Sequence, residues 1–217
     1  MKKTFVVIII VIIAALFFWF LAKKGVAPEP LETGKNASPS PSVGAITNGN
    51  KVTWVAPISN ARERITKKPF DIFVSPADSP VSPEKFTGYH TGVDFEIFSG
   101  EENSSVSVYA ICSGPLLEKI TASGYGGVAV QKCELNNQPV TVVYGHVKLS
   151  SIVIKSGQQL KAGDKLAVLG EGFSAETGGE RKHLHIGIHK GAGVELRGYV
   201  QNPDELTSWI NLADYIR

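Results

Sequence analysis

Four of the five histidines in this 217-residue chain lie in three short motifs, which are His90-x-x-x-Asp94, Tyr144-Gly145-His146 and His183-Leu184-His185. If residues 181–190 form a β-strand, its period of two places imidazoles on one face and aliphatic side chains on the other. The imidazole face carries His183, His185 and His189, and the aliphatic face carries Leu184, Ile186 and Ile188. The aliphatic face can then pack against a core while the imidazoles face a groove.

The residue types in these motifs are those that bind zinc. Neutral imidazole and carboxylate are both zinc ligands, and a catalytic zinc needs three of them with a fourth position left for water. The motifs offer three ligands and two spare histidines. They therefore predict a catalytic metal site.

Further motifs share the order and approximate spacing of one known family. They are Gly88-Tyr89-His90-Thr91-Gly92-Val93-Asp94-Phe95, Val108-Tyr109-Ala110, Gly124-Tyr125-Gly126 and the segment 157–170 with its three glycines. Over residues 51–199 the chain resembles the lysostaphin and LytM-type zinc metallopeptidases, which cut peptide bonds in bacterial peptidoglycan. The resemblance implies a mainly β, antiparallel two-sheet domain of the duplicated hybrid motif type, with a substrate groove across a zinc ion.

The resemblance also implies roles for individual residues. His90, Asp94 and His185 correspond to the zinc ligands of the family. His146 and His183 correspond to its catalytic pair, which moves protons and stabilises the oxyanion. The fifth histidine matches no position of the family, and we expect it at the rim of the groove or on the surface.

Four further residues are candidate substrate contacts. Tyr89 and Tyr144 could each add a hydroxyl to the site, or could pack in the core or the groove wall. Arg181 and Lys182 directly precede the HxH motif, where they could meet a carboxylate of a peptidoglycan stem or lie in a solvated loop. We expect Glu96 to be an outer or surface carboxylate and not the general base.

Two segments depart from the family pattern. Residues 176–182 form a long, charged approach to the HxH motif, where the family has a short loop ending in Gly-Pro or a similar pair. Residues 100–105 are an apparent insertion. Both changes alter the groove walls and therefore the substrate preferences that the resemblance implies.

The start of the chain is strongly apolar. Thr4 to Ala22 contain no charged residue, and a helix of that length spans roughly 28 Å, close to the hydrocarbon core of a bilayer. Bulky side chains run directly into Lys23 and Lys24, and the one small-x-small cleavage option is followed by Pro28, so an uncleaved signal anchor is favoured over a cleaved signal peptide. This predicts a single-pass protein of the cell membrane whose catalytic domain lies outside the cytoplasm.

The chain is predicted to have three regions. Residues 1–24 form the membrane anchor, residues 25–50 a Pro/Ser/Gly-rich linker with too little apolar surface to fold, and residues 51–217 the zinc metallopeptidase domain. Runs rich in β-branched and aromatic residues predict strands over 106–111, 116–120, 128–132, 140–144, 166–169 and 183–188. A capping box with proline, Asn202-Pro203-Asp204-Glu205, predicts a short terminal helix over residues 205–209.

The two cysteines, Cys112 and Cys133, lie in two predicted strands that could be neighbours. A disulfide is expected if the domain lies outside the cytoplasm, and a pair of buried thiols is the alternative. The pair does not form a zinc signature.

The charge balance of the chain excludes one class of partner. Removing the four lysines of the first 24 residues leaves 18 basic residues against 20 acidic ones, a balance of −2. With no basic stripe and no aromatic platform, nucleic acid is not an expected partner. The expected partners are peptidoglycan peptides and, through the N-terminal helix, the membrane.

Two other functions remain as alternatives. A non-catalytic cell-wall or divisome protein could use the same fold to activate an amidase, but such proteins typically lack some ligands. The segment 154–170 also resembles the hairpin of biotinyl and lipoyl carrier domains, which have no use for the HxxxD and HxH motifs.

Overall fold

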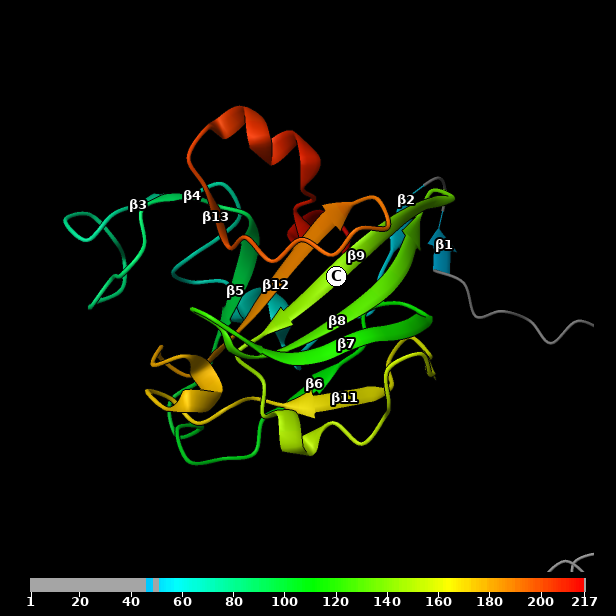
Figure 1. The fold of residues 1–217 in the computed structure, drawn as a ribbon, viewed down its shortest axis with the longest axis horizontal. Coiled ribbons are helices and arrows are strands. Elements are labelled where there is room, and N and C mark those ends of the chain that lie inside the picture. The colour runs from blue at the N-terminus through cyan, green and yellow to red at the C-terminus, as the bar shows by residue number, and fades with distance from the viewer. Residues whose placement is uncertain (1–45, 49–50, 217) are drawn as a thin grey trace, which may run out of the picture. The chain divides into compact units, whose positions relative to one another are not determined.

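The computed structural model describes residues 46–48 and 51–216, and its centre is a six-stranded antiparallel sheet in the order β10-β7-β8-β9-β12-β5 (Figure 1). Its strands are β5 (Gly92–Glu96), β7 (Gly114–Ala122), β8 (Gly126–Leu135), β9 (Gln138–Gly145), β10 (Gln159–Leu160) and β12 (His183–Lys190). This arrangement confirms the expected mainly β, antiparallel fold.

The other described strands form three smaller antiparallel sheets. They are β1 (Ile46–Asn48) with β2 (Lys51–Thr53), β6 (Ser107–Tyr109) with β11 (Lys165–Val168), and β3 (Phe73–Val74) with β4 (Gly88–His90) and β13 (Tyr199–Val200). Helical segments are short: α2 (Ala61–Arg64) and the 3₁₀ turns η1 (Leu149–Ser151), η2 (Ala175–Thr177), η3 (Pro203–Ser208) and η4 (Leu212–Asp214).

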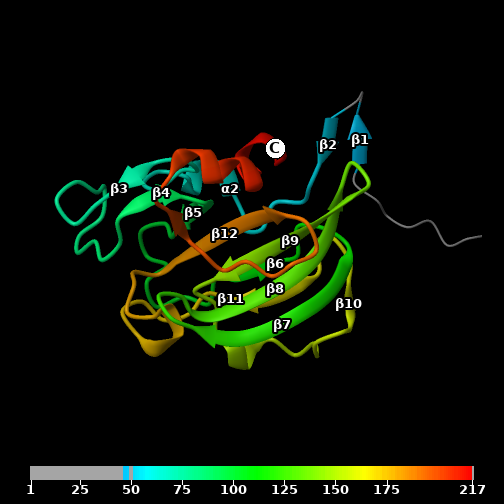
Figure 2. The same cartoon turned by 45° about the horizontal axis from the view of Figure 1, so that its top comes forward.

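One face of the six-stranded sheet packs against the β6–β11 pair to form the main core, and Figure 2 shows the pair alongside the curved sheet. The strand period of two selects alternate residues for this face. On β12 these are Leu184, Ile186 and Ile188, all of them fully or almost fully buried. The intervening residues His183 and His185 face the opposite side of the sheet, as the sequence pattern predicted.

All six predicted strands are present, most of them extended by a few residues. The terminal helix is a 3₁₀ helix over Pro203–Ser208, and Asn202 and Glu205 form the expected capping box. Cys112 and Cys133 are joined by a disulfide between neighbouring positions of the β7–β8 region.

The predicted anchor at residues 1–24 and nearly all of the predicted linker lie outside the described residues. Among residues 46–48 and 51–216, no helix is long and apolar enough to cross a membrane.

Candidate metal centre

The register of three neighbouring strands brings the histidine motifs together. His185 on β12 pairs with Asp94 on β5 on one side and with Gly145, the last residue of β9, on the other. His90 ends β4, four residues before Asp94. The three motifs, far apart in the sequence, thus meet on the face of the sheet opposite the main core.

Three side-chain atoms form a tight triangle at this point. His90 Nε2 lies 3.0 Å from His185 Nδ1, Asp94 Oδ1 lies 3.1 Å from His185 Nδ1, and Asp94 Oδ1 lies 3.4 Å from His90 Nε2. Ligands about 2.0–2.1 Å from a tetrahedral zinc are about 3.3 Å from one another, so the triangle has the size that such an ion requires. All three residues are buried.

Main-chain carbonyls fix the tautomers of three histidines. The Nδ1 atoms of His90, His146 and His183 lie 3.1, 3.0 and 2.8 Å from the carbonyl oxygens of Pro69, Thr177 and Arg181. A nitrogen that faces a carbonyl must carry the proton, so each Nε2 keeps a lone pair. The Nε2 atoms of His90 and His183 lie within 3.4 Å of the Asp94 carboxylate.

Two acceptors of this triangle face each other. The Nε2 atom of His90 is an acceptor, and Asp94 Oδ1 is a carboxylate oxygen, so these two atoms repel each other without a proton or a metal ion. Imidazole and carboxylate are the donor set of zinc. The residues present therefore fit the metal that the sequence predicted.

The surroundings of His185 and Asp94 favour the protonation states that bind a metal ion. Burial lowers the pKa of His185 to about 4, although the hydrogen bond with Asp94 opposes this shift. Burial would raise the pKa of the Asp94 carboxyl, but the imidazoles of His183, His90 and His185 around it hold that pKa well below its usual range. Neutral imidazole and ionised carboxylate are the forms that bind metal ions.

His146 and His183 lie beside the triangle with ring centroids 4.2 Å apart. His146 has the same strand parity as the core residue Tyr144, but β9 ends at Gly145 and His146 adopts a left-handed φ of 62°, which turns its imidazole toward the site. Burial and then the neighbouring His183 lower the pKa of His146 well below its usual value. His146 is therefore neutral at neutral pH, with its Nε2 lone pair unprotonated.

Two glycines make room for the rings of the site. A Cβ atom at Gly92 would lie 2.5 Å from the His185 ring, and one at Gly145 would lie 2.5 Å from the Tyr125 ring. Any larger residue at these positions would displace the imidazole or the phenol that lines the pocket.

The structure places Tyr144 in the core and not in the site. Its side chain is fully buried, and its hydroxyl donates to Gln131 Oε1 and accepts from the backbone of Ile111. Tyr89 alternates with His90 on β4 and packs edge-on against Phe73, outside the pocket. Neither tyrosine offers the site a hydroxyl, because strand alternation turns each one away from it.

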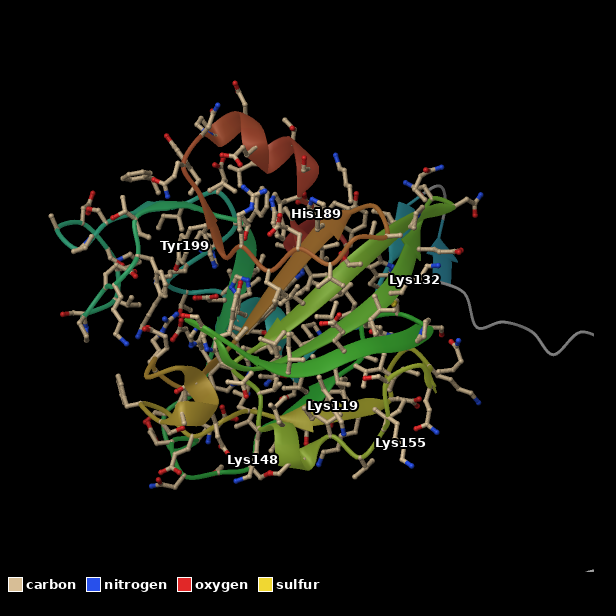
Figure 3. All side chains as sticks on the ribbon, viewed as in Figure 1. Lys119, Lys132, Lys148, Lys155, His189 and Tyr199 are labelled. Atoms are coloured by element: carbon tan, nitrogen blue, oxygen red, sulfur yellow. A yellow bond between two sulfur atoms is a disulfide. The ribbon has the colours of Figure 1, made fainter. Side chains whose placement is uncertain are left out.

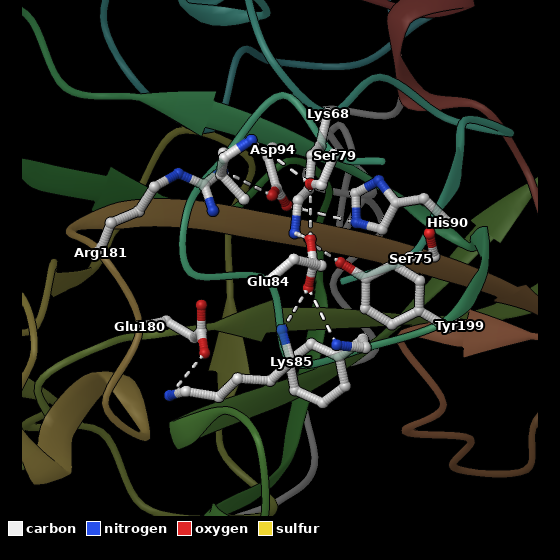
Figure 4. Close-up of polar contacts among 12 residues, drawn as sticks. Lys68, Ser75, Ser79, Glu84, Lys85, His90, Asp94, Glu180, Arg181 and Tyr199 are labelled. Carbon is white, nitrogen blue, oxygen red and sulfur yellow. Dashed lines mark hydrogen bonds and ion pairs between the residues drawn. The ribbon is translucent and has the colours of Figure 1, made fainter. Parts of the chain in front are cut away.

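Of the two predicted basic contacts, only Arg181 lines the pocket. Its guanidinium donates to the carboxylates of Asp94 and Glu96. Figure 4 shows Arg181 beside Asp94. The Lys182 ammonium is turned away and donates to the backbone carbonyls of Glu101, Glu102 and Ser104. Lys182 thus ties its segment to the loop of residues 101–104.

The remaining histidine, His189, lies outside the site. Its ring packs against Trp209 with centroids 5.0 Å apart, near the end of β12 (Figure 3). This position agrees with the expected rim or surface location.

Sequence reasoning missed several residues that line the pocket. Tyr125 places its hydroxyl 3.2 Å from His185 Nε2, while Tyr199 stacks on Phe86 and accepts from Lys68 Nζ. Lys68 also forms a buried ion pair with Glu84, seen in Figure 4. The motif around Tyr125 was a signal for that residue alone; nothing in the sequence indicates that Lys68, Glu84 and Tyr199 meet.

A model of Peptidase family M23 matches residues 88–201, more than half of the chain and the whole of the histidine cluster. The chain belongs to this family. No curated protein matches it.

Three solved structures similar to this M23 chain are distant in sequence. LytU is 23% identical, with a TM-score of 0.46 and coverage of 68% of this chain and 80% of that one. The catalytic domain of lysostaphin from Staphylococcus simulans is 17% identical, with a TM-score of 0.46 and coverage of 70% and 93%. Csd3 from Helicobacter pylori is 22% identical, with a TM-score of 0.46; the match covers 77% of this chain and only 35% of the Csd3 chain.

Proposed function

We propose that this chain is a zinc metalloendopeptidase that hydrolyses cross-links or stem peptides of bacterial peptidoglycan. The observation that carries the proposal is the triangle of His90 Nε2, Asp94 Oδ1 and His185 Nδ1, with a second pair of histidines directly beside it. Membership of a peptidase family supports a peptide substrate. The resemblance to the lysostaphin and LytM-type enzymes supports peptidoglycan as its source.

His90, Asp94 and His185 would hold the metal ion. A zinc ion in this position would lower the pKa of its bound water to about 7 and polarise the scissile carbonyl. His146 and His183 act as the general acid–base pair. Each directs its Nδ1 proton to a backbone carbonyl, so its Nε2 atom can accept a proton. One of them takes the proton from the attacking water, and the protonated ring then stabilises the oxyanion and protonates the leaving amine.

The protonated phenol of Tyr125 forms one wall of this site. Burial raises its pKa, so the hydroxyl keeps its proton. It lies 3.2 Å from His185 Nε2, the ring nitrogen that points away from the triangle. A hydroxyl there orients the ligand ring by satisfying its second nitrogen.

The complete set of ligands and both catalytic histidines favours an enzyme over a non-catalytic amidase activator of the same fold. An experiment separates the two. Purified protein is incubated with purified cell walls, with and without a zinc chelator, and the released fragments are analysed by mass. New peptide termini that disappear with the chelator support the enzyme; walls cut only when an amidase is added would support the activator.

We also propose that the protein acts at the outer face of the cell membrane. This rests on the uncharged segment from Thr4 to Ala22 and the Pro/Ser/Gly-rich stretch after it. The disulfide between Cys112 and Cys133 supports an extracytoplasmic location, because such bonds persist in oxidising compartments.

A further inference from the structure

Asp94 directs its two carboxylate oxygens to different partners. Oδ1 belongs to the triangle with His90 and His185. Oδ2 lies 2.9 Å from Arg181 Nη2 and 3.3 Å from His183 Nε2. Only one oxygen therefore points to the proposed metal position.

Arg181 is itself fixed by a second carboxylate. Its Nε atom lies 3.1 and 3.0 Å from the two oxygens of Glu96, and its Nη2 also donates to that carboxylate. Asp94 and Glu96 are two residues apart on β5, so they point to the same face and one planar guanidinium can bridge them. The side chain of Arg181 is only 13% exposed. The fork cannot turn away from Asp94 without also breaking its contacts with Glu96.

The backbone of Arg181 supports the catalytic pair. Its carbonyl oxygen accepts the hydrogen bond from His183 Nδ1 at 2.8 Å. One residue thus sets the orientation of a ligand carboxylate with its side chain and the tautomer of a histidine with its main chain. Arg181 lies in residues 176–182, the segment before the HxH motif that is longer and more charged than the short loop of the lysostaphin and LytM-type enzymes.

We infer that Arg181 is a positioning residue that restricts Asp94 to one-oxygen coordination of the metal. A carboxylate that is free to rotate can supply both oxygens and occupy the position that a catalytic zinc leaves for water. The fork of Arg181 prevents this by holding Oδ2 out of the triangle. The inference rests on the proposed zinc site and adds a specific function for a residue first considered as a substrate contact.

Two substitutions in the full-length protein separate the effect of the planar guanidinium of Arg181 from the effect of its positive charge. Arg181→Gln removes both, whereas Arg181→Lys keeps the positive charge and loses the planar fork. Zinc affinity is measured by competition with a chromogenic chelator. Metal geometry is measured from the visible spectrum of the cobalt(II) form, whose absorption weakens as the coordination number rises above four.

We expect both variants to bind zinc about 10–100-fold more weakly and to lose cobalt absorption intensity, because an outer partner of a ligand typically contributes that much. Lys182→Gln is the matched control, since Lys182 anchors the same segment without touching a ligand. It should keep the cobalt spectrum of the wild type. The Lys variant retains a cation opposite Glu96 and serves as the folded comparison if the Gln variant does not fold.

Three results would overturn the inference: unchanged affinity and spectrum in both Arg181 variants, full restoration by lysine, or an equal spectral change in Lys182→Gln. These outcomes are distinct from failure of the proposed function. A wild-type protein that binds zinc but cuts no cell wall would contradict the enzyme, while the cobalt spectra would still support or overturn the function of Arg181.

Discussion

His185 on β12 lies directly opposite Asp94 on β5, and its Nδ1 atom is 3.1 Å from Asp94 Oδ1. The register of the sheet sets this distance, because a slip of one residue would turn His185 to the core face. The candidate metal centre is therefore built on paired strands, which hold side chains more rigidly than loops do.

The first prediction concerns the metal. The purified protein should contain close to one zinc per chain, and His90→Ala and Asp94→Ala should each lose most of it, because two ligands do not hold zinc tightly. Elemental analysis measures the content. Full zinc retention in both variants would contradict the ligand assignment.

A second prediction separates ligands from proton carriers. His146→Ala and His183→Ala should keep zinc but lose cell-wall hydrolysis by about 10²–10⁴-fold, the usual contribution of a general acid or base. His189→Ala is the matched control, since His189 contacts Trp209 and lies outside the site. Near wild-type turnover in either of the first two variants would remove that residue from the catalytic pair.

The buried ion pair between Lys68 and Glu84 should contribute more to stability than an ion pair on the surface. Both side chains are almost completely buried, so Glu84→Gln leaves an unpaired buried ammonium and should destabilise the fold at pH 7 by about 3–5 kcal/mol. Lys148→Gln, which breaks an ion pair with Glu176 on the surface, should cost about 0–1 kcal/mol. Denaturant unfolding measures both; equal losses would show that burial of the first pair is unimportant.

The pH dependence of that pair has a definite sign. Burial would raise the pKa of the Glu84 carboxyl, but hydrogen bonds from Lys68, Phe86 and Ser79 and the charge of Lys68 bring it below the ordinary value of 4.5. Its stabilising contribution is thus complete above pH 4.5 and is lost as the pH falls through the lower, folded-state pKa. Stability of the wild type should fall in this acidic range more steeply than that of Glu84→Gln.

The disulfide between Cys112 and Cys133 closes a loop with a sequence separation of 21. Replacing both cysteines by serine should lower the free energy of unfolding by about 3 kcal/mol, as expected for a loop of this length. Denaturant unfolding of the oxidised wild type and the double variant measures the difference. Two free thiols on alkylation of unreduced protein from its native compartment would contradict the bond.

The last prediction concerns the N-terminal region, residues 1–50. The mature protein should fractionate with membranes and keep its N-terminal lysines if Thr4 to Ala22 form an uncleaved anchor. If residues 25–49 form the predicted flexible linker, these 25 residues reach roughly 25–30 Å. Deleting residues 28–44, which leaves β1 intact, should then leave activity of the purified protein unchanged and reduce wall cleavage in cells. A soluble protein with a new N-terminus after residue 25 would identify a cleaved signal instead.

The sequence predicted what depends on local pattern. Alternation on β12 placed His183 and His185 opposite Leu184, and the capping box at Asn202 located the terminal 3₁₀ helix. Alternation also explains why Tyr144 takes the core position, one of its two expected roles, while His146 faces the site: the strand ends between them. Contacts such as that of Lys68 with Glu84 join segments with no shared pattern, so only the folded chain shows them.

The backbone carbonyls of Pro69, Thr177 and Arg181 hold the protons of three imidazoles. A carbonyl oxygen is present whatever side chain its residue carries. Point substitutions at these positions therefore leave the acceptor in place, whereas adding or deleting one residue in the loops would move it out of reach. The lengths of these loops therefore determine which nitrogen of each imidazole carries the proton. We expect the site to be most sensitive to insertions and deletions in them.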